Sequence, residues 1–140
     1  NREEQNEVAE NAIKCGAATA ITSGSFSSEN NNSTIPIFVT ADNSDTVDYV
    51  LNKFSNSTRL NVTSGGTKKI HLAFSQFNTP EGFYPAFVDL WLLGMAKCLV
   101  HGIGGYGSLG GALGGGECIF EHRKKDGTLK GILSKCNKIE

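Results

Sequence analysis

The sequence predicts a mixed α/β domain with a short, mainly parallel β-sheet. Strand-like apolar runs and helical patterns alternate from residue 35 to residue 122, which is typical of chains that cross over between parallel strands. The length of 140 residues and a hydrophobic fraction of 39% suffice for one core, and hence for one domain of this kind. In such sheets, ligands bind outside the carboxyl ends of the strands.

The N-terminal part is expected to stand apart from that sheet. Residues 2–20 are rich in helix formers, and their apolar side chains recur at helical spacing, at Val8, Ala12, Cys15 and Ala18. Residues 22–34, "TSGSFSSENNNST", are polar and without periodicity, and predict a loop. We therefore divide the chain into a helix with a polar loop over 1–34 and an α/β domain over 35–140.

The α/β domain opens with a strand, a helix and further strands. The run "IPIFVTAD" at 35–42 predicts a strand that is buried on both faces. Ser44 is expected to cap a helix over 45–54, whose apolar residues share one face. Two more short strands are predicted at 58–63 and 69–74, on either side of a Gly-Gly pair.

The second half repeats the alternation. Pro85 suits the first turn of a helix over about 85–97, and this helix is apolar nearly all round, so we expect it to lie buried between layers. A strand at 98–102, a glycine-rich loop and a short helix at 107–114 follow. A strand "CIFEHR" comes next, and the end as a whole, "CIFEHRKKDGTLKGIL", predicts a β-hairpin that turns at the Asp-Gly pair at 126–127.

Charge and composition exclude some classes of partner. The net charge is −1, so neither nucleic acid nor an anionic membrane surface is an expected partner. No segment reaches the ~20 apolar residues that a bilayer requires, so no transmembrane segment is predicted. The chain shows no signal peptide and begins with Asn1 rather than Met, so its start is processed or lies outside this sequence.

Cysteines and glycosylation motifs bear on the compartment. The cysteines form no C-x-x-C pair, so no metal site is expected; a Cys118–Cys136 disulfide and buried free thiols both fit their spacing. The N-x-[ST] motif, the acceptor for N-glycans, occurs more often than composition explains. It occurs at Asn31, Asn32, Asn56 and Asn61. We therefore expect the lumen of the secretory pathway, in the endoplasmic reticulum or Golgi.

The glycine-rich loop at 102–107, "GIGGYG", allows three interpretations. It fits G-x-G-x-x-G with Glu121 downstream, as in dinucleotide sites, but the unit from 98 to 121 is shorter than the ~30 residues of a full crossover. It lacks the Gly-Lys-[Ser/Thr] of a Walker A loop, yet its backbone N–H groups suit a phosphate. Alternatively, the glycines serve only close packing of helix on sheet. The residues alone leave the last two interpretations open.

Residues 87–114, "FVDLWLLGMAKCLVHGIGGYGSLGGALG", resemble the C-terminal donor-binding region of fucosyltransferase-like GT-B glycosyltransferases. This family includes α-1,6-fucosyltransferases and protein O-fucosyltransferases. Residues 37–43, "IFVTADN", are similar to the strand end that the family writes [IV]-F-[VL]-x-T-D-[DN]. The resemblance covers about residues 35–122. It implies a Rossmann-like three-layer domain, half of a GT-B architecture, with GDP-sugar as donor substrate and no separate cofactor.

The resemblance implies a nucleoside pocket made by two segments. Asp89 would accept hydrogen bonds from guanine, and Asp42 and Asn43 would line the pocket, with Thr40 supplying a hydroxyl. Each assignment has a structural alternative. Asp89 could pair with a neighbouring group, and Asp42 could cap the following helix.

The same resemblance places the diphosphate of the donor at the glycine-rich loop. The backbone of Gly104, Gly105 and Tyr106 would meet it at the N-terminus of the next helix, where the family usually has S-S-[FQ]. Tyr106 could equally be a packed aromatic residue.

Departures from the family limit the implied activity. The family's H-x-R motif, whose arginine stabilises the leaving GDP, does not occur in residues 1–34, and His71 further on lacks the arginine. The sequence contains no strand-bound D-x-D motif, so a metal ion that bridges to the diphosphate is not implied. The chain is therefore expected to be a GDP-sugar donor-binding half without catalytic activity on its own. The alternative is a glycosyltransferase-derived structural or accessory subunit that binds other protein subunits.

Overall fold

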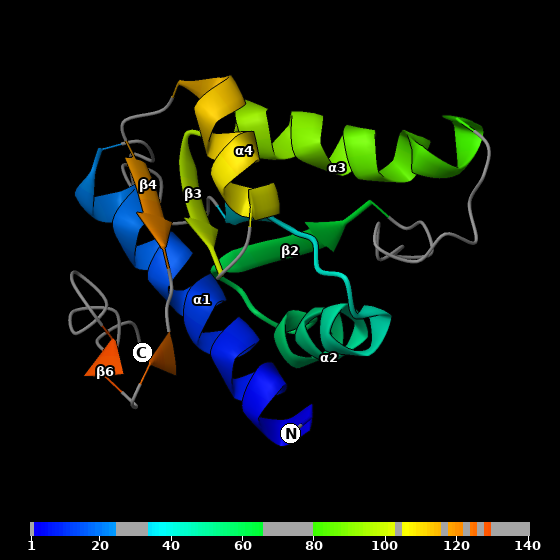
Figure 1. Ribbon diagram of the computed structural model, residues 1–140. Coiled ribbons are helices and arrows are strands. Elements are labelled where there is room, and N and C mark those ends of the chain that lie inside the picture. The colour runs from blue at the N-terminus through cyan, green and yellow to red at the C-terminus, as the bar shows by residue number, and fades with distance from the viewer. Residues whose placement is uncertain are drawn as a thin grey trace.

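A computed structural model of the chain describes residues 2–24, 34–65, 80–102, 105–115, 118–121, 124–125 and 128–129 (Figure 1). These residues form a mixed α/β structure, as predicted. The helices are α1 (Arg2–Thr22), α2 (Ser44–Phe54), the 3-10 helix η1 (Pro80–Phe83), α3 (Tyr84–Met95) and α4 (Gly105–Gly114). The strands are β1 (Ile35–Val39), β2 (Leu60–Ser64), β3 (Cys98–His101), β4 (Cys118–Glu121), β5 (Lys124–Lys125) and β6 (Thr128–Leu129).

Two β–α–β units make up the described part of the α/β region. Strand β1 pairs in parallel with β2, from Ile35 opposite Leu60, and α2 connects the two. Strand β3 pairs in parallel with β4, from Cys98 opposite Cys118, and α4 connects these. The parallel pairing is confirmed. In the described residues, the two pairs form separate two-stranded sheets.

Three details of the predicted strands change. Residues 118–121 pair in parallel with β3, and the antiparallel pair is confined to β5 and β6, because β4 completes a crossover before the chain reaches the hairpin. β1 is only partly buried and Pro36 is exposed, because β1 has β2 as its one neighbour among the described strands. The predicted strand at 69–74 and the turn at 126–127 lie outside the described residues.

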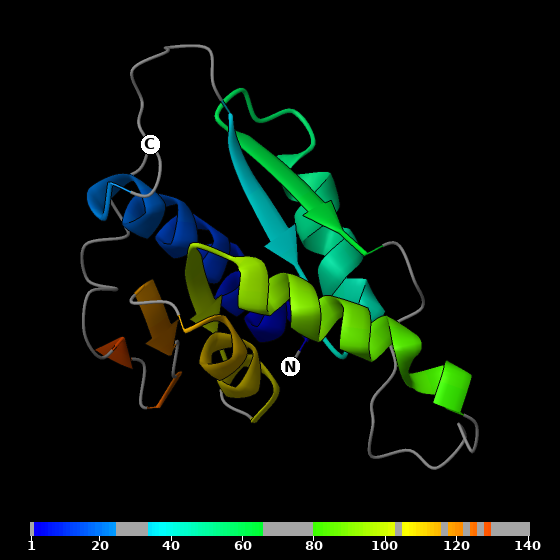
Figure 2. The same cartoon turned by 90° about the horizontal axis from the view of Figure 1, so that it is seen from above.

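Helix α1 packs between the two units. It contacts β3 on one side and α2 and β1 on the other (Figure 2). Small side chains permit this double contact: Cys15, Ala17 and Thr19 are buried, and a Cβ at Gly16 would lie 3.7 Å from Val100 Cγ2. The helix itself was predicted, but with one buried apolar face. In the structure, residues on two sides of the helix are buried. None of the described helices is both long and apolar enough to cross a membrane.

The cysteines pair differently from the predicted alternatives. Cys98 and Cys118 form a disulfide across β3 and β4, where the two residues are register partners with Cα atoms 4.6 Å apart. This overturns the Cys118–Cys136 pairing, because parallel pairing of β3 and β4 brings Cys98 next to Cys118. Cys15 is also disulfide-bonded, and none of the described cysteines is a free thiol.

Helix α3 is not buried between layers, contrary to the prediction. Asp89 and Leu90 are buried, but Phe87 is 61% exposed and Trp91 is 69% exposed. The reason is that α3 packs closely against α4 with one face, and no described element covers the opposite face. In Figures 1 and 2, α3 extends beyond β2 and α2, away from the rest of the described chain.

Glu10 of α1 contacts two side chains of α2, Tyr49 and Lys53, and also Lys14 of its own helix. It accepts from Lys14 Nζ at 2.9 Å and from the Tyr49 hydroxyl at 3.2 Å, and Lys53 Nζ lies 3.7 Å away. The hydrogen bond and charge of Lys14 lower the pKa of Glu10 below its ordinary 4.5, helped by Tyr49 and Lys53 and opposed by burial. A carboxyl with a depressed pKa stabilises the fold above its ordinary pKa, and this stabilisation is lost as the pH falls through the folded value.

We expect Glu10→Gln to lower the free energy of unfolding at pH 7 by about 1 kcal/mol, as for a partly buried charged hydrogen-bonded pair. The difference from wild type should shrink as the pH falls below 4.5 and vanish once Glu10 is protonated in both the folded and the unfolded chain. Urea unfolding at several pH values measures this. The exposed Glu7→Gln is the control and should change stability by less than about 0.5 kcal/mol. A Glu10→Gln effect that is equal at pH 3 and pH 7 would contradict the charge account.

Candidate functional site

Three residues that the sequence proposed for a ligand site come together at the carboxyl end of β1. Thr40 directly follows β1, Asp89 lies in α3, and Tyr106 lies in the first turn of α4. The Thr40 hydroxyl donates to Asp89 Oδ2 at 2.5 Å, and the Tyr106 hydroxyl donates to the carbonyl oxygen of Ala86 on α3. Two hydroxyls thus tie the end of β1 and the start of α4 to α3.

Asp89 is the buried centre of this cluster. It is 4% exposed, although α3 is otherwise largely open on one face. Its position follows from the helical repeat, since Ala86, Leu90 and Asp89 share the face of α3 that is turned towards α4 and β1. A buried carboxylate needs hydrogen-bond donors, and Thr40 supplies one.

Tyr106 is affected by the same surroundings. Burial raises the pKa of its hydroxyl above the ordinary 10.0, and the charge on Asp89 raises the pKa further; a backbone hydrogen bond at Leu90 opposes both. The phenol therefore stays protonated at neutral pH and acts as a donor. The Tyr106 hydroxyl thus has a structural partner in the backbone of α3.

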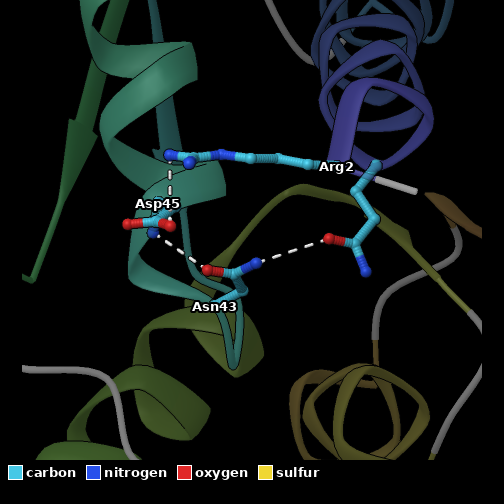
Figure 3. A network of polar contacts seen from close by, with 4 residues as sticks. Arg2, Asn43 and Asp45 are labelled. Carbon is cyan, nitrogen blue, oxygen red and sulfur yellow. Dashed lines mark hydrogen bonds and ion pairs between the residues drawn. The ribbon is translucent and has the colours of Figure 1, made fainter.

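Asn43 is used by the fold instead of lying free for a ligand. Its Oδ1 accepts from the backbone N–H of Asp45 at 3.0 Å, which makes Asn43 the N-cap of α2 (Figure 3). The predicted cap at Ser44 is wrong, because the helix begins one residue earlier and Ser44 is already helical. Asn43 Nδ2 donates to Gln5 Oε1 at 3.4 Å, and Arg2 pairs with Asp45 at 3.1 Å, so α1 holds this cap from the other side.

The remaining predicted residues are exposed or lie outside the described ranges. Asp42 is exposed on the loop before the cap. Gly105 is exposed at the first position of α4, and a Cβ there would meet none of the described residues within 4 Å. The start of α4 is therefore accessible, as a phosphate site at a helix N-terminus requires. Gly104 lies outside the described residues.

Glycines inside α4 have a packing role. Gly107, Gly110, Gly111 and Gly114 recur at helical spacing, and a Cβ at each would press on His101, Leu93, Ile119 or Gly94, respectively. At Gly110 the added Cβ would lie 2.7 Å from Leu93 Cβ, closer than carbon atoms approach. The packing interpretation thus explains the glycines of the helix, whereas Gly102 and Gly105 in and beside the loop have no such neighbour.

The sequence did not reveal two residues beside the start of α4 and at its contact with α3, His101 and Gly94. His101 at the end of β3 lies against Gly107 and its Nδ1 is 2.9 Å from the carbonyl oxygen of Gly102. Gly94 of α3 lies against α4. The i, i+3, i+4, i+7 spacing of the α4 glycines was the signal that could have indicated a close helix contact. Within the described ranges, no three His, Cys, Asp or Glu side chains are grouped to hold a metal ion.

Comparisons with protein-family models, with curated proteins and with solved structures give no match for this chain. The resemblance to fucosyltransferase-like enzymes therefore stays a prediction, and functional arguments depend on the geometry around Thr40, Asp89 and Tyr106.

Replacing Thr40 tests the cluster. We expect Thr40→Val, which keeps the side-chain shape, to lower the free energy of unfolding by about 1.5–3 kcal/mol, because buried Asp89 loses a donor. Thr63→Val is the matched control: Thr63 is exposed on β2 and its hydroxyl makes only a 3.5 Å contact with Ile37 O. Denaturant unfolding of both variants measures the difference. Equal effects of the two substitutions would show that the Thr40–Asp89 hydrogen bond is unimportant for stability.

Proposed function

We propose that this chain is the donor-binding half of a GDP-sugar-dependent glycosyltransferase of the fucosyltransferase-like type, without catalytic activity on its own. The observation that carries the proposal is the convergence of Thr40, Asp89 and Tyr106. Thr40 and Asp89 lie 49 residues apart in the sequence, and Tyr106 lies further on in α4. The resemblance implies a donor-binding role for all three, and residues of one binding site are expected to share a location.

The cluster and the start of α4 suggest how a GDP-sugar would lie. The exposed N-terminus of α4 at Gly105 suits the diphosphate, since helix N–H groups and the helix dipole favour anions there. Asp89 suits the N–H donors of guanine, which would replace the Thr40 hydroxyl at Oδ2. Because Asp89 is buried, this exchange requires the Thr40 side chain to turn away when the base enters. The hydroxyl of Tyr106 then fixes α4 relative to α3 during binding.

The Rossmann-like, three-layer arrangement belongs to the same proposal. Two successive β–α–β units with parallel pairing support it, since nucleotide-binding halves of this kind are built from such units. The missing H-x-R motif supports the absence of catalysis, because the leaving GDP would lack its arginine.

A second candidate is an accessory subunit derived from such an enzyme. Two observations favour it. Asn43 is used as the N-cap of α2, and the Tyr106 hydroxyl donates to the Ala86 carbonyl of α3, so two residues of the implied donor site have structural roles. The exposed apolar face of α3 further suits a chain whose role is to contact protein.

A location in the lumen of the secretory pathway is also part of the proposal. Disulfides persist in oxidising compartments, and the Cys98–Cys118 bridge supports that environment. Asn56 of the Asn-Ser-Thr motif is exposed in the turn after α2, where an N-glycan would not meet the core.

Calorimetric titration of the chain with GDP tests the donor site. We expect GDP to bind, NAD not to bind, and Asp89→Asn to weaken GDP binding by about tenfold or more, roughly 1.4 kcal/mol. Asp45→Asn is the control, since it changes a carboxylate on α2 that pairs with Arg2 outside the cluster, and its affinity for GDP should stay within about twofold of wild type.

Each variant is first shown to be folded by its unfolding transition. A folded wild-type chain that binds no GDP would refute the donor site and leave the accessory subunit. Binding of NAD would instead support the dinucleotide interpretation of the glycine-rich loop.

A further inference from the structure

Helix α3 carries a continuous row of exposed apolar side chains. Tyr84, Phe87, Val88, Trp91 and Met95 follow one another at i, i+3, i+4, i+7 and i+11, so they lie on one side of the helix. All five are more than half exposed, from 54% for Val88 to 69% for Trp91. We call these five residues the α3 apolar face. It lies opposite the side of α3 that contains Asp89 and Leu90 and contacts α4.

The face is large for a chain that has no partner. Large side chains bring about 150–250 Å² each, so the exposed parts of these five sum to roughly 600 Å². Isolated proteins rarely leave more than ~300–600 Å² of contiguous apolar surface open. A standard interface takes about 800 Å² from each partner, and this face together with the neighbouring exposed Leu113 of α4 approaches that area. The area therefore matches one half of a stable dimer contact.

The absence of charge on the face indicates which partner fits. Between Tyr84 and Met95, and again between Gly105 and Gly114, the one charged side chain is Asp89, which is buried. In a contact between two copies about a twofold axis, each surface meets the same surface of the other copy. A charged side chain near the axis would therefore face a side chain of the same charge, which is unfavourable. Helices that bind anionic membranes carry Lys or Arg along the polar side, and α3 has neither. A surface without charge and rich in Tyr, Phe, Trp and Met suits a second copy of itself.

We propose that this protein forms a homodimer through the α3 apolar face. The α3 helices of two copies pack along each other about a twofold axis, and Trp91 lies near the centre of the contact. Figures 1 and 2 show that α3 extends beyond β2 and α2. The dimer does not rest on the proposed GDP site, because that site uses the opposite side of α3.

Sedimentation equilibrium of the full chain from about 1 to 100 µM, without reductant, tests the dimer. The mass should rise from 14.9 kDa towards twice that value. Trp91 is the one tryptophan of the chain, so its fluorescence reports on the face directly. Its emission should shift to the blue and its quenching by acrylamide should fall over the same concentration range.

A charged substitution separates this face from other contacts. Trp91→Glu, at a position that is already exposed, should fold normally and weaken self-association by at least about thirtyfold, as for a central interface residue. Asn52→Glu adds the same charge at an exposed position of α2 and should leave self-association unchanged.

Several outcomes would overturn the proposal. One is a chain that stays monomeric at 100 µM, whether Trp91 is accessible or is shielded by another segment of the same chain. Another is a dimer that Trp91→Glu leaves intact. A third is a monomer whose Trp91 emission shifts only on addition of phosphatidylcholine vesicles, which would assign the face to lipid.

Discussion

The close contact between α3 and α4 is the constraint on which the described site depends. It is made by backbone against backbone, with Gly94 on α3 and Gly110 and Gly114 on α4. Side chains of ordinary size would hold the two helices about 8–10 Å apart, and glycines allow a nearer approach. Alanine favours helices by about 0.5–1 kcal/mol over glycine, so α4 gives up helix propensity for this approach.

The contact has consequences on both sides of α3. On the inner side, it brings the Tyr106 hydroxyl to the backbone of α3 and places Asp89 where the Thr40 hydroxyl can donate to it. On the outer side, it leaves the α3 apolar face uncovered, because α4 is the main helix that packs on α3. The Cys98–Cys118 disulfide links the two strands that flank α4 covalently. One helix contact thus organises both the candidate ligand site and the candidate interface.

The sequence predicted local features better than long-range ones. The existence of α1, β1 and α2 followed from the spacing of apolar residues, and the parallel pairing followed from the alternation of strands and helices. The cap of α2 was misplaced by one residue, since Asn43 and Ser44 are both good caps and only geometry selects between them. The Cys98–Cys118 pairing depends on the register of β3 and β4, and the exposure of α3 depends on how many elements cover it. Neither the register nor the number of covering elements can be read from one segment of the sequence.

The most direct test of this account is the stability of Gly110→Ala beside Gly105→Ala. Both substitutions gain helix propensity, but the new Cβ at position 110 would lie 2.7 Å from Leu93 Cβ, whereas at position 105 it would meet no part of the described chain within 4 Å. The account predicts that Gly110→Ala lowers the free energy of unfolding by about 1–3 kcal/mol and that Gly105→Ala leaves it unchanged or raises it slightly. A Gly110→Ala protein as stable as wild type would contradict the close α3–α4 contact.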